Sequence, residues 1–115
     1  MATKTSQVDT GDLQTLGGTT LSATLPTVNA GDVVYVVATW GDNVGTITGT
    51  CTVGGVSMTV GLKVRDATNT QSCCHFYLPS ASGGAVGSSI TVQLTLNASG
   101  GTFVGFYAAS WSSAQ

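Results

Sequence analysis

The residues of this chain that are best suited to chemistry are its cysteines and its single histidine. Cys73, Cys74 and His75 are consecutive, whereas Cys51 stands apart. A thiol beside an imidazole can act as a nucleophile with its base, and the same groups bind zinc. Consecutive residues of a strand point to opposite faces, however, and zinc sites use spacings such as C-x₂-C. Only Cys51, on another strand, could therefore meet His75, and we predict neither a catalytic pair nor a metal site here.

The cysteines also bear on the redox compartment. Their number is odd and two of them are adjacent, which is a poor basis for a disulfide framework. We expect all three to be buried, small, apolar thiols in a reducing compartment. A single bridge from Cys51 to Cys73 or Cys74 is the alternative.

The five aspartates are the only carboxylate side chains, because the chain contains no glutamate. Hydrolysis of a glycoside needs two carboxylates in one cleft, and nothing in the spacing brings two together. The stretch Asp9-Thr10-Gly11-Asp12 lacks the alternating oxygen ligands of a calcium loop. Asx turns and solvated strand ends are expected instead at Asp9, Asp12, Asp32, Asp42 and Asp66. We predict no catalytic residue, no cofactor and no metal, and hence a protein that is not an enzyme.

The surface is nearly neutral. Only 7% of the 115 residues are charged, and the formal net charge is -2 with three Lys or Arg. Such a surface lacks the basic stripe that nucleic acid requires, and it has little charge repulsion to keep copies apart. The first residues contain no apolar run of signal-peptide length, and no segment is long enough for a membrane span. We expect no nucleic acid, no membrane, synthesis in the cytoplasm and packing against another surface.

The elements that must position these residues are strands. Runs of β-branched and aromatic residues alternate with Gly, Asn, Asp and Pro, without a helical period of useful length. The pattern predicts an all-β fold, an antiparallel two-sheet β-sandwich, Ig-like or jelly-roll-like, with about seven to eight strands. Val53-Gly54-Gly55-Val56 predicts a two-residue hairpin, because glycine adopts the positive φ of a primed turn. The expected strands are 19–25, 33–40, 46–53, 56–64, 72–78, 89–96 and 102–112.

Residues 1–18 differ from the rest of the chain. Val8, Leu13 and Leu16 are their main apolar anchors, so that alone they would form a loose arm. Extended arms bind by adding backbone hydrogen bonds to exposed strand edges. We predict that 1–18 is an N-terminal arm and an assembly element, and that 19–115 is the β-sandwich domain.

The strand at 33–40 raises the question of what covers its second face. Alternate residues point to opposite faces, and from Val33 to Trp40 both sets are largely apolar. A two-layer core covers one face, so the other needs the arm or a partner chain. Trp40 and Trp111 end apolar strands and either close the core or contact a partner. The interface candidates are Val8, Leu13, Leu16, Trp40 and Trp111.

Four stretches, AGDVVYVVATW, CTVGGVSMTV, CCHFYLPSASGG and SITVQLTLNASGGTFVGFYAASWS, together resemble a β-sandwich module common in tailed-bacteriophage virion proteins. In that module a G-D strand start is followed by a glycine hairpin, an aromatic strand, a T-V-x-L-T strand and a final aromatic-Ser motif. The resemblance covers about residues 29–113. It implies a structural role without catalytic residues, similar to that of capsid decoration (cement) proteins, which sit outside a phage head and tie capsomers together.

Three functions remain in competition at this point. The first is a virion protein on the capsid surface, bound to the major capsid protein as a homo-oligomer such as a trimer. The alternative is a carbohydrate- or receptor-binding module on a tail or fibre, and exposed aromatic residues in a groove would favour it. The third is a hydrolase, for which no nucleophile, base and orienting residue stand in register. The candidates for stacking on sugars are Trp40, Trp111, Tyr77 and Tyr107.

Overall fold

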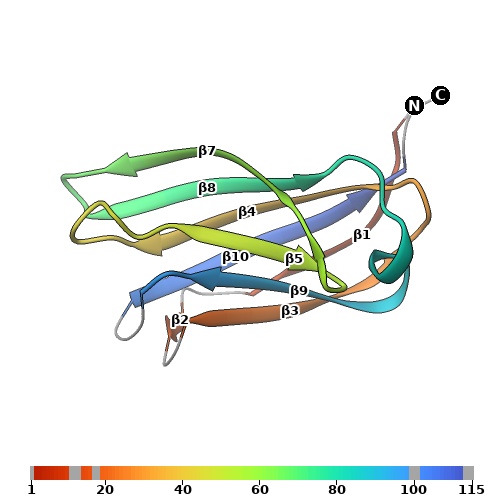
Figure 1. Ribbon diagram of the computed structural model, residues 1–115, viewed down its shortest axis with the longest axis horizontal. Coiled ribbons are helices and arrows are strands. Elements are labelled where there is room, and N and C mark those ends of the chain that lie inside the picture. Colours follow the sequence, from red (N-terminus) through yellow and green to blue (C-terminus); the bar gives the residue numbers. More distant parts are fainter. Residues whose placement is uncertain (1, 11–13, 17–18, 99–101, 113–115) are drawn as a thin grey trace.

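The computed structural model describes residues 2–10, 14–16, 19–98 and 102–112, apart from the side chains of 14–16 and 102, and they form a sandwich of two antiparallel sheets (Figure 1). The larger sheet has the order β1 (Lys4–Asp9), β10 (Thr102–Trp111), β4 (Val33–Gly41), β8 (Gln71–Leu78), β7 (Thr59–Asp66), and β2 (Gln14–Leu16) also pairs with β10. The smaller sheet has the order β3 (Thr20–Val28), β9 (Gly87–Leu96), β5 (Gly49–Val53), β6 (Val56–Ser57). The predicted fold class is confirmed.

All seven expected strands are present, with small shifts at their ends. The expected strand 56–64 is divided into β6 and β7, and the expected strand 46–53 begins at Gly49. A short 3-10 turn, η1 (Gly83–Ala85), lies in the connection between β8 and β9. The strands β1 and β2 were not expected, because the N-terminal segment lacks an alternating apolar pattern.

The predicted glycine hairpin joins β5 to β6. Gly54 and Gly55 have φ values of +57° and +82°, the left-handed conformations of a primed turn. A Cβ on Gly54 would come 2.0 Å from the carbonyl oxygen of Gly84, so the hairpin also packs directly on the backbone at η1. Glycine at 54 is thus required by both the turn and this contact.

The core lies between the sheets and is made by inward-pointing residues of the long strands other than β7, whose apolar side chains are exposed. On β4 the inward set, Val34, Val36, Ala38 and Trp40, is fully buried. The Trp40 indole also donates a hydrogen bond of 3.3 Å to the carbonyl oxygen of Ile47. Trp40 therefore closes the core, and its expected role in an interface or in sugar stacking is wrong, because no part of the side chain reaches the surface.

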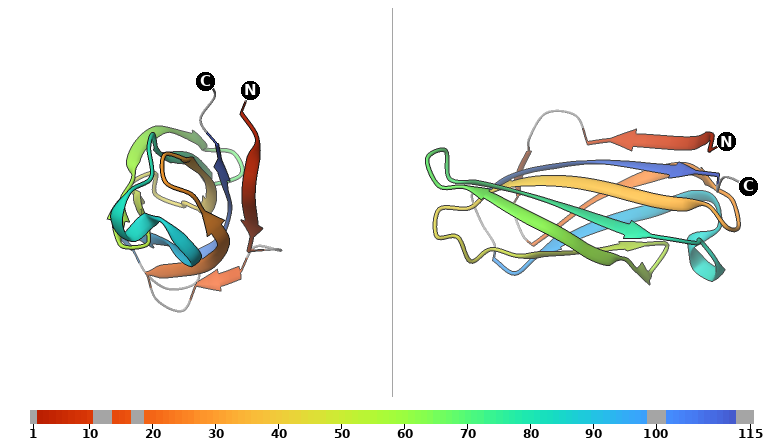
Figure 2. Two further views of the ribbon diagram at one scale, coloured as in Figure 1. Left: turned by 90° about the vertical axis from the view of Figure 1, so that its right-hand side faces the viewer. Right: turned by 90° about the horizontal axis from the view of Figure 1, so that it is seen from above.

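The N-terminal segment joins the larger sheet edge to edge. β1 pairs antiparallel with β10, and beyond the strand the Ser112 amide donates to the Thr3 carbonyl at 2.8 Å (Figure 2). Val8 is half-buried and packs against the core. The described part of the segment thus extends the sheet edge to edge and does not cover the outward side of β4, the apolar face for which the sequence showed no cover. Leu13 lies outside the described residues, as does the side chain of Leu16.

Ser6 ties the two sheets together beside this edge. Its hydroxyl lies 2.8 Å from that of Ser110 on β10 and is hydrogen-bonded to the Thr27 carbonyl on β3. Ser110 donates to the same carbonyl at 3.0 Å. β1 therefore contributes to the sandwich itself, and its role as an assembly element stays a prediction.

Candidate functional site

The outward side of the larger sheet, here called the outer face, carries a broad apolar surface. It consists of the side chains of β10, β4, β8 and β7 that point away from the core. Leu62 is 73% exposed, Val64 58% and Val37 38%. Phe103, Tyr107 and Trp111 of β10 are also exposed. A contiguous exposed apolar patch on a small domain indicates an interaction site.

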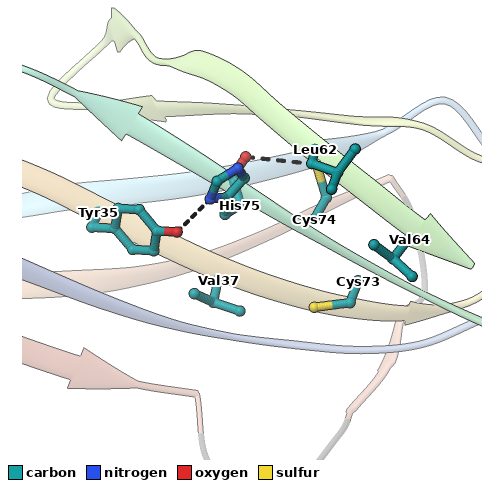
Figure 3. Close-up of a pocket in the computed structure, with 7 residues that line it drawn as sticks. All are labelled: Tyr35, Val37, Leu62, Val64, Cys73, Cys74 and His75. Carbon is teal, nitrogen blue, oxygen red and sulfur yellow. Dashed lines mark hydrogen bonds between the residues drawn. The ribbon is translucent and has the colours of Figure 1, made fainter.

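A shallow depression of about 280 Å³ lies in this face over β8 (Figure 3). Its walls come from three neighbouring strands, so that it depends on the sheet order β4, β8, β7. It is lined by Tyr35, Val37, Leu62, Val64, Cys73, Cys74 and His75.

His75 is held in this depression by aromatic neighbours. Its Nδ1 is hydrogen-bonded to the Tyr35 hydroxyl, and the two rings meet edge to face with centroids 5.4 Å apart (Figure 3). The ring of Tyr77 lies 6.2 Å away on the same strand. Below the imidazole is Gly61, where a Cβ would come 1.9 Å from Nε2. The β7 irregularity between Val60 and Lys63 sets Gly61 at this position.

The burial of the three thiols agrees only in part with the expectation from the sequence. All three are free, and Cys51 and Cys74 are buried as predicted, but Cys73 is exposed. Burial raises the pKa of Cys51 to about 12. Burial, and then the neighbouring Cys73, raise the pKa of Cys74. Neither thiol is therefore ionised near neutral pH.

Cys73 and His75 share the outer face, a relationship that the sequence reasoning missed. Consecutive residues of a strand point to opposite sides, whereas residues two apart, such as Cys73 and His75, point to the same side. Cys51 lies in the opposite sheet, so the pairing with His75 considered from the sequence does not form. Among the described residues, His, Cys and Asp form no group of three or more that could hold a metal ion.

Asp42 is buried, which corrects the expectation of a solvated strand end. Its carboxylate accepts hydrogen bonds from the Ser72 hydroxyl at 2.9 Å and the Gly45 amide at 2.6 Å, and lies 3.2 Å from the Lys63 ammonium. Burial raises its pKa, but the hydrogen bonds from Ser72, Gly45 and Lys63 outweigh this effect and hold the pKa below 3.8. The backbone carbonyl of Asp42 accepts two bonds from Arg65. This cluster fixes the loop after β4 to β7 and β8.

The other described aspartates bear out part of the expectation. Asp32 is buried and accepts a hydrogen bond of 3.0 Å from the Asn29 amide, three residues before it, so the expected Asx turn and solvated strand end are not found there. Asp66 is exposed and caps its turn through the amides of Thr68 and Asn69. Asp12 lies outside the described residues.

Of the interface candidates, Trp111 lies on the outer face and is 38% exposed. Among the candidates for sugar stacking, Tyr107 is exposed and donates a hydrogen bond of 2.8 Å to Oε1 of Gln7 on β1. Lys4 donates to the same oxygen at 2.6 Å. The margin of the outer face along β10 and β1 thus combines aromatic rings with polar groups, whereas the part over β8 and β7 is mainly apolar.

No protein-family model matches this chain, and no curated protein sequence is significantly similar to it. Its fold is similar to a solved structure of the EclA C-terminal domain, a sugar-binding protein. The match has a TM-score of 0.50 and 14% identity, and covers 91% of this chain and 74% of that one. At this identity the likeness shows the fold alone. No helix in the described part of the chain is long and apolar enough to cross a membrane.

Proposed function

We propose that this chain is a non-enzymatic structural module that acts by packing its outer face against another protein surface. The finer proposal is a phage capsid decoration protein, located on the virion and bound to the major capsid protein. The observation that carries it is the apolar outer face, on which Val37, Leu62 and Val64 are 38%, 73% and 58% exposed. Burying such side chains contributes about 1.5–3 kcal/mol each, so this face is a strong site for association.

The chemistry of the outer face favours a protein partner over a small substrate. The depression is shallow and mainly apolar, whereas catalytic pockets enclose the substrate and place several polar groups around it. His75, the only imidazole, is engaged by Tyr35. The motifs shared with phage virion modules support the same structural role.

A second candidate is a carbohydrate-binding module. Tyr107 and Trp111 are exposed on β10, and Tyr107 lies beside the polar side chains of Gln7 and Lys4, an arrangement suited to stacking and hydrogen bonding with a sugar. The similarity in fold to a sugar-binding protein domain supports the comparison without assigning a site.

Co-sedimentation with empty heads, assembled from the major capsid protein of the same source, tests the first proposal. We expect the wild-type chain to sediment with the heads and Val37→Asp to stay in the supernatant. Thr24→Asp, which places the same charge on an exposed strand position of the smaller sheet, should bind normally. Equal binding by all three proteins, or by none, would contradict the proposal.

Affinity electrophoresis in gels containing soluble polysaccharides tests the second candidate. Retardation that Trp111→Ala abolishes and Thr24→Asp leaves unchanged would favour a sugar ligand on the β10 margin. Because Trp40 is fully buried, a change in tryptophan fluorescence on adding the polysaccharide would report on Trp111. Unchanged migration and fluorescence across the panel would remove this candidate.

A further inference from the structure

The outer face has a ridge and a hollow on opposite sides of β4. The ridge is on β10, where the aromatic residues Phe103, Tyr107 and Trp111 alternate with the small residues Gly105 and Ala109. The hollow is the depression over β8 and β7. β10 and β8 are the two strands that flank β4 in the sheet. The face therefore carries large projecting side chains on one side of β4 and a depression on the other side.

The strand register places the ridge and the hollow at the same height. Tyr107 pairs with Val37, and Val37 pairs with His75, so that these three residues form one row across the sheet. Consider a two-fold axis that runs parallel to β4 and passes above Val37. Rotation about this axis places β10 of a second copy opposite β8 of the first, and β8 of the second copy opposite β10 of the first. In a second copy related by this axis, Tyr107 would face the depression around His75, and the first copy would do the same in return. Such reciprocal contacts define an isologous interface.

From this self-complementary relief we infer that the outer face packs against the outer face of a second copy of this chain, with Tyr107 of each copy filling the depression of the other. The inference rests on the proposed role of the outer face as a contact surface, and it identifies a second copy of this chain as the partner that covers the face. The strands of the two faces would run roughly aligned, as in other packed sheets. Val37 would lie beside its symmetry mate at the axis.

The size of the face is close to that of a small stable interface. With the β1 margin included, the five strands of the larger sheet, spaced by about 4.8 Å, are about 24 Å wide. Eight paired positions of β4 and β8 are about 26 Å long at about 3.3 Å per residue. The projected area is roughly 600 Å² before the relief of side chains is counted, and a standard interface buries about 800 Å² per partner. The outer face with its β1 margin therefore reaches the lower end of the standard range, about 600 Å² per partner.

Charge does not oppose this arrangement. On β10, β4 and β8, no outward-pointing residue of the described chain is Asp, Glu, Lys or Arg. The basic residues of β7, Lys63 and Arg65, turn to the other side of the sheet and contact Asp42. Exposed charges lie at the two edges of the face, Lys4 and Asp9 on β1 and Asp66 at the end of β7. The strands between these edges can therefore be covered without burying unpaired charges, whose desolvation would cost several kcal/mol.

Sedimentation equilibrium of the full chain, from about 1 μM to about 200 μM, tests the inference over the range of micromolar dissociation constants. We expect twice the chain mass at the upper concentration for the wild type and for Thr24→Asp. Val37→Asp, which opposes two carboxylates at the axis, and Tyr107→Ala, which empties the depression, should remain monomers. Circular dichroism confirms that each variant is folded. A wild-type monomer at about 200 μM, or a dimer that survives both variants, would overturn the inference.

Cys73 gives a second measurement on the unmodified protein. It lines the depression and is exposed in the single chain, whereas Cys51 and Cys74 are buried. Dimerisation should cover it, so its rate of reaction with a maleimide should fall by about tenfold between the lowest and highest concentrations, following mass action. A rate independent of concentration would contradict the dimer. In Val37→Asp the rate should not change with concentration.

The outcomes separate this inference from the proposed function. A wild-type monomer that binds heads through Val37 would overturn the dimer and leave the function intact. A Val37-dependent dimer that binds no heads would uphold the dimer and overturn the function.

Discussion

The imidazole of His75 occupies the space in which a side chain of residue 61 would lie, and Gly61 leaves this space free. A Cβ at Gly61 would come 1.9 Å from Nε2 and 2.0 Å from Cδ2 of His75. The ring is thereby held against β7 while Nδ1 is hydrogen-bonded to the Tyr35 hydroxyl. One glycine in an irregular part of an edge strand thus sets the shape of the depression on the outer face.

Gly61→Ala should destabilise the fold by displacing this ring. The contact is too short for a real Cβ, so the imidazole must leave its position and give up its contact with Tyr35. Overpacking of this kind costs about 1–3 kcal/mol in the free energy of unfolding, which urea denaturation measures.

The double variant Gly61→Ala/His75→Ala is the matched control. Without the imidazole the new methyl group has room, so the second substitution should recover part of the loss caused by the first. A double-mutant cycle measures this coupling. Strictly additive effects of the two substitutions would contradict the proposed clash.

Asp42→Asn should destabilise the protein at neutral pH and have less effect in acid. The hydrogen bonds from Ser72, Gly45 and Lys63 outweigh the effect of burial and hold the Asp42 pKa below 3.8. Because the folded-state pKa is lower than the unfolded one, ionised Asp42 contributes stability above the unfolded pKa, and this contribution is lost as the pH falls through the folded pKa.

Urea denaturation at a series of pH values measures this difference. The deficit of Asp42→Asn should be about 1–3 kcal/mol at pH 7 and should shrink below about pH 4. Asp66→Asn, at an exposed turn, serves as the control and should show a much smaller deficit at pH 7. A deficit in Asp42→Asn that is independent of pH would show that the charge is unimportant.

The three thiols should react in two distinct classes. In dilute folded protein, a maleimide should modify Cys73 quickly, because it is the exposed thiol. Cys51, with its pKa raised to about 12, and buried Cys74 should react only after unfolding. Mass spectrometry should therefore find one adduct before denaturant and three after it. Rapid modification of Cys51 in the folded chain would contradict the described burial.

The sequence predicted those parts of the fold that depend on local patterns. The spacing of apolar residues and turn residues located the six long strands β3, β4, β7, β8, β9 and β10 and the shorter β5, and paired glycines located the hairpin at Gly54. β1 was missed because Lys4–Asp9 is mostly polar and pairs through its backbone, which leaves little mark on the side-chain pattern. Residues at a sheet edge carry less burial, and so less sequence signal, than residues in the core.

The candidate site depends on relationships that no local pattern contains. The strand at Val33 to Trp40 showed that one apolar face lacked cover, which correctly located the outer face. The place of Gly61 below His75 depends on the β7 and β8 register, and the burial of Asp42 depends on Ser72, Lys63 and Arg65 from those same strands. The shared side of Cys73 and His75, in contrast, follows from their spacing and could have been predicted.

The N-terminal segment should contribute to the stability of the sandwich. A chain that begins at Thr19 loses β1 and β2 and exposes the edge of β10. The core is otherwise built from later residues, with Val8 as the part of β1 that packs on it, so the shortened chain should fold with reduced stability. The loss should be about 3 kcal/mol or more, from several backbone hydrogen bonds at about 0.5–1.5 kcal/mol each. A synthetic peptide of residues 2–10 should bind the free edge and restore the unfolding midpoint, as added strands do at exposed edges, whereas a scrambled peptide should not. If the shortened chain is as stable as the full one, β1 contributes nothing to the fold and remains only a candidate assembly element; if it cannot fold even with the peptide, β1 is needed to form the sandwich.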